Sequence, residues 1–492
     1  MSKAATGLTG SISERVGSGL VWMTAAGVSA RVLGLISAIV LTRVLEPADF
    51  GIVAAAGAVI GFTKVTTATG FDSAIVQRRE DPAEFLNTAW TVELGRYLLL
   101  FTVLFASAPL VAVLFDSPES GTVVRVLSLT LILQGFNNIG MVCLTRELDF
   151  RKIFIWRTVP LLAGSISVIA LALLLKSLWA LVWAELVQAL CACALSYALH
   201  PFRPRPELAW KKARELFAFG KWVFGTSVIV TMRQQGVSLF TGNLLGLASL
   251  GVFNRAVSFS TRVFDQFVEM VWRIGYPAYS LLQKRPESFR KAYVETLSLV
   301  AFLGIPACAG LIVLSNDFVD AVLTEKWSAA APVMQILSAA AALHILNAPA
   351  SVAFQAAGSP ELNTKLSMRG FVILAALIYP LASGLGLTGV ALAMFISTLA
   401  ITPSSFLLAA RIAGCGNEHL KALCGPAAAS VLMALFVLFI KSRAAASGLS
   451  GFLALAVSGA GFYFIICYLL EKITGAGAFG LFMERFAAMR PR

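Results

Sequence analysis

The stretch LEPADFGIV at residues 45–53 returns in altered form as LGLASLGVF at residues 245–253. The two copies align at an offset of 200 residues, and each places a glycine at the same point, Gly51 and Gly251. A tryptophan opens the preceding apolar run in both copies, at the start of WMTAAG (22–27) and of WVFGTS (222–227). About six apolar runs separate the copies, so both run in the same direction. The repeat therefore predicts two parallel halves, a plan known in membrane proteins with a binding site between the halves.

The composition is that of a membrane protein. The chain has 492 residues, of which 58% are hydrophobic and 13% charged, and its mean hydropathy is +0.81. Soluble domains average about 25% charged residues. Apolar runs of roughly 20 residues recur from 20–45 to 451–470, and each is long enough to cross a bilayer as a helix. We expect an all-α, polytopic membrane protein with about fourteen transmembrane helices.

The charged loops predict the orientation. Basic stretches such as RELDFRK (146–152) and RPRPELAWKKAR (203–214) alternate with acidic connections such as EPAD (46–49) and DSPES (116–120). Because Lys and Arg accumulate in cytoplasmic loops, this alternation places both termini in the cytoplasm. The net charge of +13 has the same explanation and does not indicate nucleic-acid binding.

One apolar run contains five charges. The stretch GVFNRAVSFSTRVFDQFVEMVWRIGY (251–276), taken as part of one helix over 250–281, places them on a single arc of roughly 80°. They are Arg255, Arg262, Asp265, Glu269 and Arg273. Charges at the centre of a membrane helix cost about 2.5–3.5 kcal/mol each, so we expect this face to line a hydrated space. Ion pairing of Arg262 with Asp265 or Glu269 is the structural alternative.

Further cations lie deep in other predicted spans. Arg31 and Arg233 occupy nearly corresponding positions of the two repeats, and Lys64 lies within the second span. A basic cavity favours an anionic ligand, and phosphate suits guanidinium groups because these donate in a fork. The expected substrate-binding set is Arg31, Lys64, Arg233, Arg255, Arg262 and Arg273. Asp265 and Glu269 are candidates for coupling to Na⁺ or H⁺, or for charge balance.

Side chains that could recognise sugars are scattered along the sequence and form no motif. The candidates are Asn137, Asn138, Gln234, Gln235, Trp183 and Trp272.

The opening of the chain resembles a known family. The segments RVLEPADFGIVA (43–54), GFDSAIVQRRE (70–80) and LNTAW (86–90) resemble Wzx-type oligosaccharide flippases, the polysaccharide-transporter branch of the MOP superfamily. Five residues carry its R-x-L-x-P-x-x-F-G pattern: Arg43, Leu45, Pro47, Phe50 and Gly51.

The resemblance implies two six-helix lobes, 1–210 and 211–415, that form a V around a central cavity. Residues 416–492 would add two helices and a cytoplasmic tail. It also implies an undecaprenyl-pyrophosphate-linked oligosaccharide as substrate, moved across the bacterial inner membrane by alternating access. Membrane lipid, a polysaccharide polymerase and export proteins are the implied partners. No catalytic residue, metal or other cofactor is expected.

Three alternatives stay open. A multidrug or cation antiporter of the same superfamily would have an acidic cavity. A membrane polymerase or ligase would need a large outer loop with catalytic groups. A lipid scramblase or a scaffold would not need deep cations in both halves.

One motif is a false match. GLGLTG at 384–389 satisfies G-x-G-x-x-G, but no strand precedes it. We expect a turn followed by a tightly packed helix start.

Overall fold

Helices make up nearly all of the described chain. The computed structural model describes residues 33–34, 36–71, 74–75, 83–147, 149–261, 264–443, 448–474 and 480. No strand occurs among these residues, and nine of their helices are long and apolar enough to cross a membrane. The predicted all-α membrane fold is thereby confirmed, whereas the total of fourteen spans remains a prediction.

The chain divides into two compact units, Met1–Gly251 and Val252–Arg492. The first contains α2 (Pro47–Thr66), α4 (Ala83–Leu114), α5 (Pro118–Gly135), α6 (Met141–Arg146), α7 (Phe150–Leu175), α8 (Trp179–Leu199), α9 (Trp210–Leu245) and the start of α10 (Leu247–Ser260). The second contains the rest of α10, α11 (Asp265–Leu282), α12 (Pro286–Phe318), the short η1 (Val319–Leu323) and η2 (Glu325–Trp327), α13 (Ala330–Ala356), α14 (Glu361–Ala413), α15 (Glu418–Arg443) and α16 (Gly448–Thr474). The expected lobe boundary at residue 210 differs from this division, because α9 packs on α2 in the first unit.

Local sequence signals explain where several helices begin. Pro47 and Pro118 are the first residues of α2 and α5, a position where the missing N–H of proline costs nothing. Ser117 caps α5, and its side chain accepts the main-chain N–H three residues further on. Asp149 caps α7 in the same way, with 3.2 Å between its carboxylate and the amide nitrogen of Lys152.

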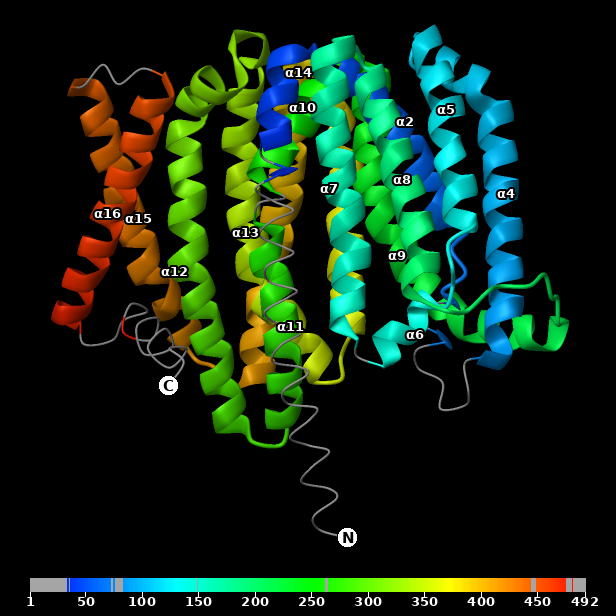
Figure 1. Cartoon of the computed structure of the whole chain (residues 1–492). Helices are drawn as coiled ribbons and strands as arrows, with labels where there is room; N and C mark the ends of the chain where they lie inside the picture. Colours follow the sequence, from blue (N-terminus) through cyan, green and yellow to red (C-terminus); the bar gives the residue numbers. More distant parts are fainter. Residues whose placement is uncertain are drawn as a thin grey trace. The chain divides into compact units, whose positions relative to one another are not determined.

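Each unit has its own apolar core. In the first unit α4 packs along α5, α7 along α8 and α2 along α9, with small residues such as Ala55 and Ala108 fully buried between them. In the second unit α12 contacts α11, α13, α15 and α16 (Figure 1). The two C-terminal helices therefore pack on the outside of α12 through residues such as Phe302 and Tyr463. Large apolar side chains outside these cores suit contact with lipid.

The repeated glycines meet in the structure. A Cβ on Gly51 would lie 1.7 Å from the carbonyl oxygen of Leu247, and a Cβ on Gly251 would lie 1.8 Å from that of Pro47. Because residues 47 and 51 correspond to 247 and 251 in the repeat, the contact is reciprocal. The first turns of α2 and α10 thus touch backbone to backbone, which only glycine permits.

The expected single helix over 250–281 is wrong. α10 ends at Ser260 and α11 begins at Asp265, so Arg255 lies on one helix and Asp265, Glu269 and Arg273 lie on another. The stretch before the break is rich in serine, threonine and valine, which have a low helix propensity. Arg262 lies outside the described residues. Arg255 therefore does not share one helical arc with Asp265, Glu269 and Arg273.

The glycine-rich motif at 384–389 behaves as expected. Gly386 has φ +60° and ψ −135° and divides α14 into two helical parts. A Cβ on Gly389 would lie 1.9 Å from the carbonyl oxygen of Leu381. The motif is thus a turn followed by close backbone packing, as predicted.

Candidate functional site

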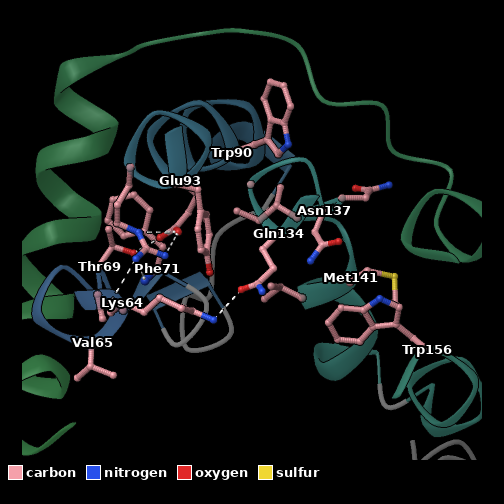
Figure 2. Close-up of a pocket in the computed structure, with 18 residues that line it drawn as sticks. Lys64, Val65, Thr69, Phe71, Trp90, Glu93, Gln134, Asn137, Met141 and Trp156 are labelled. Atoms are coloured by element: carbon pink, nitrogen blue, oxygen red, sulfur yellow. Dashed lines mark hydrogen bonds and ion pairs between the residues drawn. The ribbon is translucent and has the colours of Figure 1, made fainter. Parts of the chain in front are cut away.

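A cavity of about 420 Å³ lies in the first unit (Figure 2). Its walls come from the end of α2, from α4, α5 and α7, and from the residues that follow α2 and α5. The polar and aromatic side chains among its lining residues are Lys64, Thr69, Trp90, Glu93, Arg96, Tyr97, Gln134, Asn137, Asn138 and Trp156. The mixture of charged, amide and indole groups is typical of a ligand site with a few oriented polar contacts.

The break between α5 and α6 shapes one wall. Asn138 is almost fully buried, and its side-chain amide donates to the carbonyl oxygens of Phe202 at 2.7 Å and of His200 at 3.3 Å. Its side-chain carbonyl accepts the amide of Gly140 at 2.9 Å. Its own main-chain N–H donates to the hydroxyl of Ser196 at 2.9 Å. Asn138 therefore stabilises the turn that separates α5 from α6.

We expect Asn138→Ala to destabilise the protein by about 3 kcal/mol. The change leaves two carbonyl oxygens and one amide near α6 without their side-chain partner, and each unsatisfied buried group costs about 1–3 kcal/mol. The thermal midpoint of the detergent-solubilised protein measures this loss. Asn137→Ala is the matched control, because its side-chain oxygen has no partner among the described residues. Equal losses in both variants would contradict the assignment.

The segment after α8 is held against α4. The amide of Arg205 donates to Asn87 at 3.0 Å, and the amide of Glu207 donates to Thr91 at 2.9 Å. Nδ1 of His200 accepts the amide of Phe202 at 3.2 Å. Burial lowers the pKa of His200, which agrees with an Nδ1 that carries no proton. These contacts fix the part of α4 that supplies Trp90 and Glu93 to the cavity.

Lys64 has spare hydrogen-bonding capacity. Its ammonium group donates to the side-chain oxygen of Gln134 at 2.6 Å. An ammonium group has three N–H donors, and within the described ranges its other two have no protein acceptor. Lys64 can therefore bind an oxygen-rich anion in the cavity.

Arg96 is engaged by the protein itself. Its guanidinium group donates to one oxygen of Glu93 at 2.6 and 3.0 Å, and the hydroxyl of Thr69 donates to the other oxygen. It also donates to the carbonyl oxygen of Lys64 at 3.4 Å and to the hydroxyl of Thr67 at 3.3 Å. Arg96 thereby ties α4 to the C-terminal end of α2, where a cation also interacts favourably with the helix dipole. At the cavity, Arg96 therefore mainly holds α4 and the end of α2 in place.

The local charge is more balanced than the sequence indicated. Glu93 contacts Arg96, and Glu185 of α8 lies close enough to Lys64 to interact with it electrostatically. Two cations and two carboxylates give this region a formal charge of zero. This cavity is therefore not strongly basic, because acidic partners come from other helices than the one that carries Lys64. The basic cavity predicted between the two halves stays a prediction.

The other predicted site residues do not line this cavity. Arg31 and Arg262 lie outside the described residues. Arg233 on α9 and Arg255 on α10 are partly buried. On α11, Asp265 is exposed, and Arg273 forms a 2.6 Å ion pair with Glu269 in which both side chains are at least half exposed. Of the predicted cations, the described cavity therefore contains Lys64.

The residues of the family pattern lie at or just before the start of α2. Phe50 and Gly51 are buried at the start of α2, Pro47 is its first residue, and Arg43 is exposed.

Sequence reasoning missed several members of the cavity. Glu93 and Arg96 are not among the predicted site residues, and they lie well inside α4, which begins at Ala83. Their spacing of three residues, which lets them pair on one helix face, was the available signal. Asn137 and Asn138 were among the sugar-binding candidates, and both line the cavity.

Comparison with known proteins identifies the family. Residues 40–332 match the family described as polysaccharide biosynthesis protein. The chain is 24% identical to the lipopolysaccharide biosynthesis protein WzxC of Escherichia coli over 399 residues, 79% of this chain and 80% of WzxC. It is 25% identical to the succinoglycan biosynthesis transport protein ExoT of Rhizobium meliloti over 299 residues, 61% of this chain and 60% of ExoT.

Solved structures share the fold. The lipid II flippase MurJ in an inward closed conformation superposes with a TM-score of 0.77 at 14% identity, over 93% of this chain and all of MurJ. An inward-facing multidrug transporter of the MATE family, from the MOP superfamily, gives a TM-score of 0.56 at 17% identity, over 78% of this chain and 95% of that one. At these identities the likeness shows the fold alone. The family match and the named relatives, in contrast, confirm the resemblance to polysaccharide transporters and exclude the membrane-enzyme alternative. The chain belongs to the polysaccharide biosynthesis protein family, and it is a multi-pass membrane transporter of the flippase type.

Proposed function

We propose that this protein moves undecaprenyl-pyrophosphate-linked oligosaccharide repeat units from the cytoplasmic to the periplasmic leaflet of a bacterial inner membrane, for polysaccharide export. Family membership supports a lipid-linked glycan as cargo. The observation that carries the proposal is the cavity in the first unit, where a cation with spare donors lies beside amide and indole groups. A phosphorylated sugar head group offers the matching acceptors.

Lys64 would contact the pyrophosphate. Its two remaining N–H groups suit phosphate oxygens, and a charge-assisted hydrogen bond is stronger than a neutral one. Arg96 would keep the end of α2 in place, because Glu93 already occupies its guanidinium group. Arg31, Arg233, Arg255, Arg262 and Arg273 remain proposed contacts of the substrate in other stages of transport.

Transport would proceed by alternating access. The head group enters from the cytoplasmic side, the polyprenyl chain stays in lipid, and a conformational change then opens the opposite side. Coupling to a Na⁺ or H⁺ gradient belongs to the proposal, with Asp265 and Glu269 as candidates. A polysaccharide polymerase and export proteins would take over the product.

The charge of the cavity does not separate this proposal from a cation antiporter. Both carboxylates near Lys64 could balance a cation as well as position a lysine. Family membership decides in favour of polysaccharide transport.

A deletion strain tests the proposal. We expect the lipid-linked glycan to accumulate in the inner leaflet when the gene is deleted, and mass spectrometry of the lipid extract to give the mass of the repeat unit. Re-expression of the wild-type chain should restore glycan on the periplasmic side. A deletion strain with unchanged lipid-linked glycan and unchanged polysaccharide would refute the proposal.

A further inference from the structure

Two tryptophans and two asparagines line the cavity, and the members of each pair differ. In each pair the fold satisfies the polar atoms of one side chain and leaves a buried polar atom of the other without a partner. The side chains with satisfied polar atoms hold the wall of the cavity together, and the side chains with an unpartnered atom are available to bind a ligand.

The indole groups show the contrast first. Nε1 of Trp156 on α7 donates to the carbonyl oxygen of Ala192 on α8 at 3.1 Å. Nε1 of Trp90 on α4 is buried and has no acceptor in the part of the chain that the structure describes. The Trp90 side chain is 6% exposed and packs with Phe71 and Ile139. Its ring is therefore fixed in place with an unused donor at the cavity.

The adjacent asparagines repeat the pattern. Asn138 donates to two carbonyl oxygens and accepts one amide, so its side chain is fully used by the turn. Oδ1 of Asn137 is buried and has no donor among the described residues. The terminal torsion of asparagine is broad, so a small rotation is enough to turn this oxygen toward an occupant.

Such orphaned groups are uncommon and costly. More than nine in ten buried polar groups have a partner, and leaving one unsatisfied costs about 1–3 kcal/mol. Here an orphaned donor and an orphaned acceptor belong to the same cavity as Lys64, whose ammonium group has spare donors. Figure 2 shows the charged residues Lys64 and Glu93 toward one side of the view, and Asn137, Met141 and Trp156 toward the other.

A sugar ring offers the hydrogen-bonding partners that these groups lack. Each hydroxyl group both donates and accepts, so neighbouring hydroxyls can accept from Trp90 and donate to Asn137. The apolar face of a pyranose suits the indole walls, which present large rigid surfaces. A phosphate group alone would satisfy the donors but could not donate to Asn137.

We propose that Trp90 and Asn137 form a sugar subsite that determines which glycan the transporter accepts, an inference that rests on the proposed function. The subsite binds the sugar nearest the pyrophosphate while Lys64 binds the phosphate oxygens. Trp156 and Asn138 hold its walls.

Binding to two lipids tests this subsite. The purified wild-type chain and its variants are placed in nanodiscs, and their affinities are measured for undecaprenyl pyrophosphate and for the lipid-linked repeat unit purified from the deletion strain. We expect the wild type to bind the sugar-bearing lipid at least tenfold more tightly. Trp90→Phe and Asn137→Leu should each reduce this preference at least threefold and leave the affinity for undecaprenyl pyrophosphate unchanged. Trp210→Phe, at an exposed position, is the control and should keep the preference.

The outcomes separate the two proposals. If the wild type binds neither lipid, the proposed function fails and the subsite fails with it. If it binds both lipids and the preference survives in both variants, the subsite alone is wrong. A melting experiment adds an independent check: Asn137→Leu should be at least as stable as the wild type, because it removes an unpartnered polar atom. A clear loss of stability in this variant would overturn the inference.

Discussion

Gly51→Ala is expected to prevent stable folding of the transporter. The added Cβ would lie 1.7 Å from the carbonyl oxygen of Leu247, and the obstacle is backbone, which cannot rotate away as a side chain can. The first turns of α2 and α10 would have to separate, at a cost of roughly 3 kcal/mol or more. Gly251→Ala should behave in the same way, since its Cβ would lie 1.8 Å from the carbonyl oxygen of Pro47.

Gly57→Ala is the matched control for this prediction. It lies in the same helix, and no described atom lies within 4 Å of the Cβ that it would gain. Alanine favours a helix interior over glycine by about 1 kcal/mol, so this variant should be as stable as the wild type or more so. Size-exclusion profiles and thermal midpoints of the solubilised proteins measure the effect. A Gly51→Ala protein that is monodisperse and melts with the wild type would show that the two backbones do not touch.

Lys64→Met should reduce transport at least tenfold without unfolding the protein. Methionine keeps the length and apolar stem of the side chain but removes the charge and the hydrogen bond to Gln134. A hydrogen bond to a charged group contributes about 1.5–3 kcal/mol, and about 1.4 kcal/mol corresponds to a tenfold change in affinity. The fold should survive, because Arg96 holds the end of α2 through the main chain of residue 64.

Complementation of the deletion strain measures this second effect. The strain that expresses Lys64→Met should accumulate lipid-linked glycan in the inner leaflet at wild-type levels of protein. Lys472→Met, at an exposed position near the end of α16, provides the same substitution outside the cavity and should restore export. Full restoration by Lys64→Met would remove this residue from the substrate site.

Much of the helical framework followed from the sequence. Length and hydropathy placed the spans, and the repeat predicted that Gly51 and Gly251 are equivalent, which their reciprocal contact confirms. The turn at Gly386 also followed, because glycine between two apolar runs permits a backbone conformation that other residues avoid.

The cavity could not be predicted in the same way. Hydropathy marks where a helix enters the apolar core and not where it begins, so it does not show that Glu93 and Arg96 lie well inside α4. The partners of Lys64 are 70 residues away in the case of Gln134 and on α8 in the case of Glu185. Only tertiary packing brings these groups together, and one sequence without its relatives contains no signal for such pairs.

The two cations of the cavity, Lys64 and Arg96, have different roles: Arg96 holds the backbone, and Lys64 presents its side chain to the cavity. Arg96 grips the end of α2 by the main-chain oxygen of residue 64 and by Thr67, while the ammonium group of that same residue extends away to Gln134. Position 64 can thus be exchanged without loosening the framework that presents it. Because the backbone contacts hold the wall, its side chains can differ between relatives, or be re-engineered, on an otherwise unchanged scaffold.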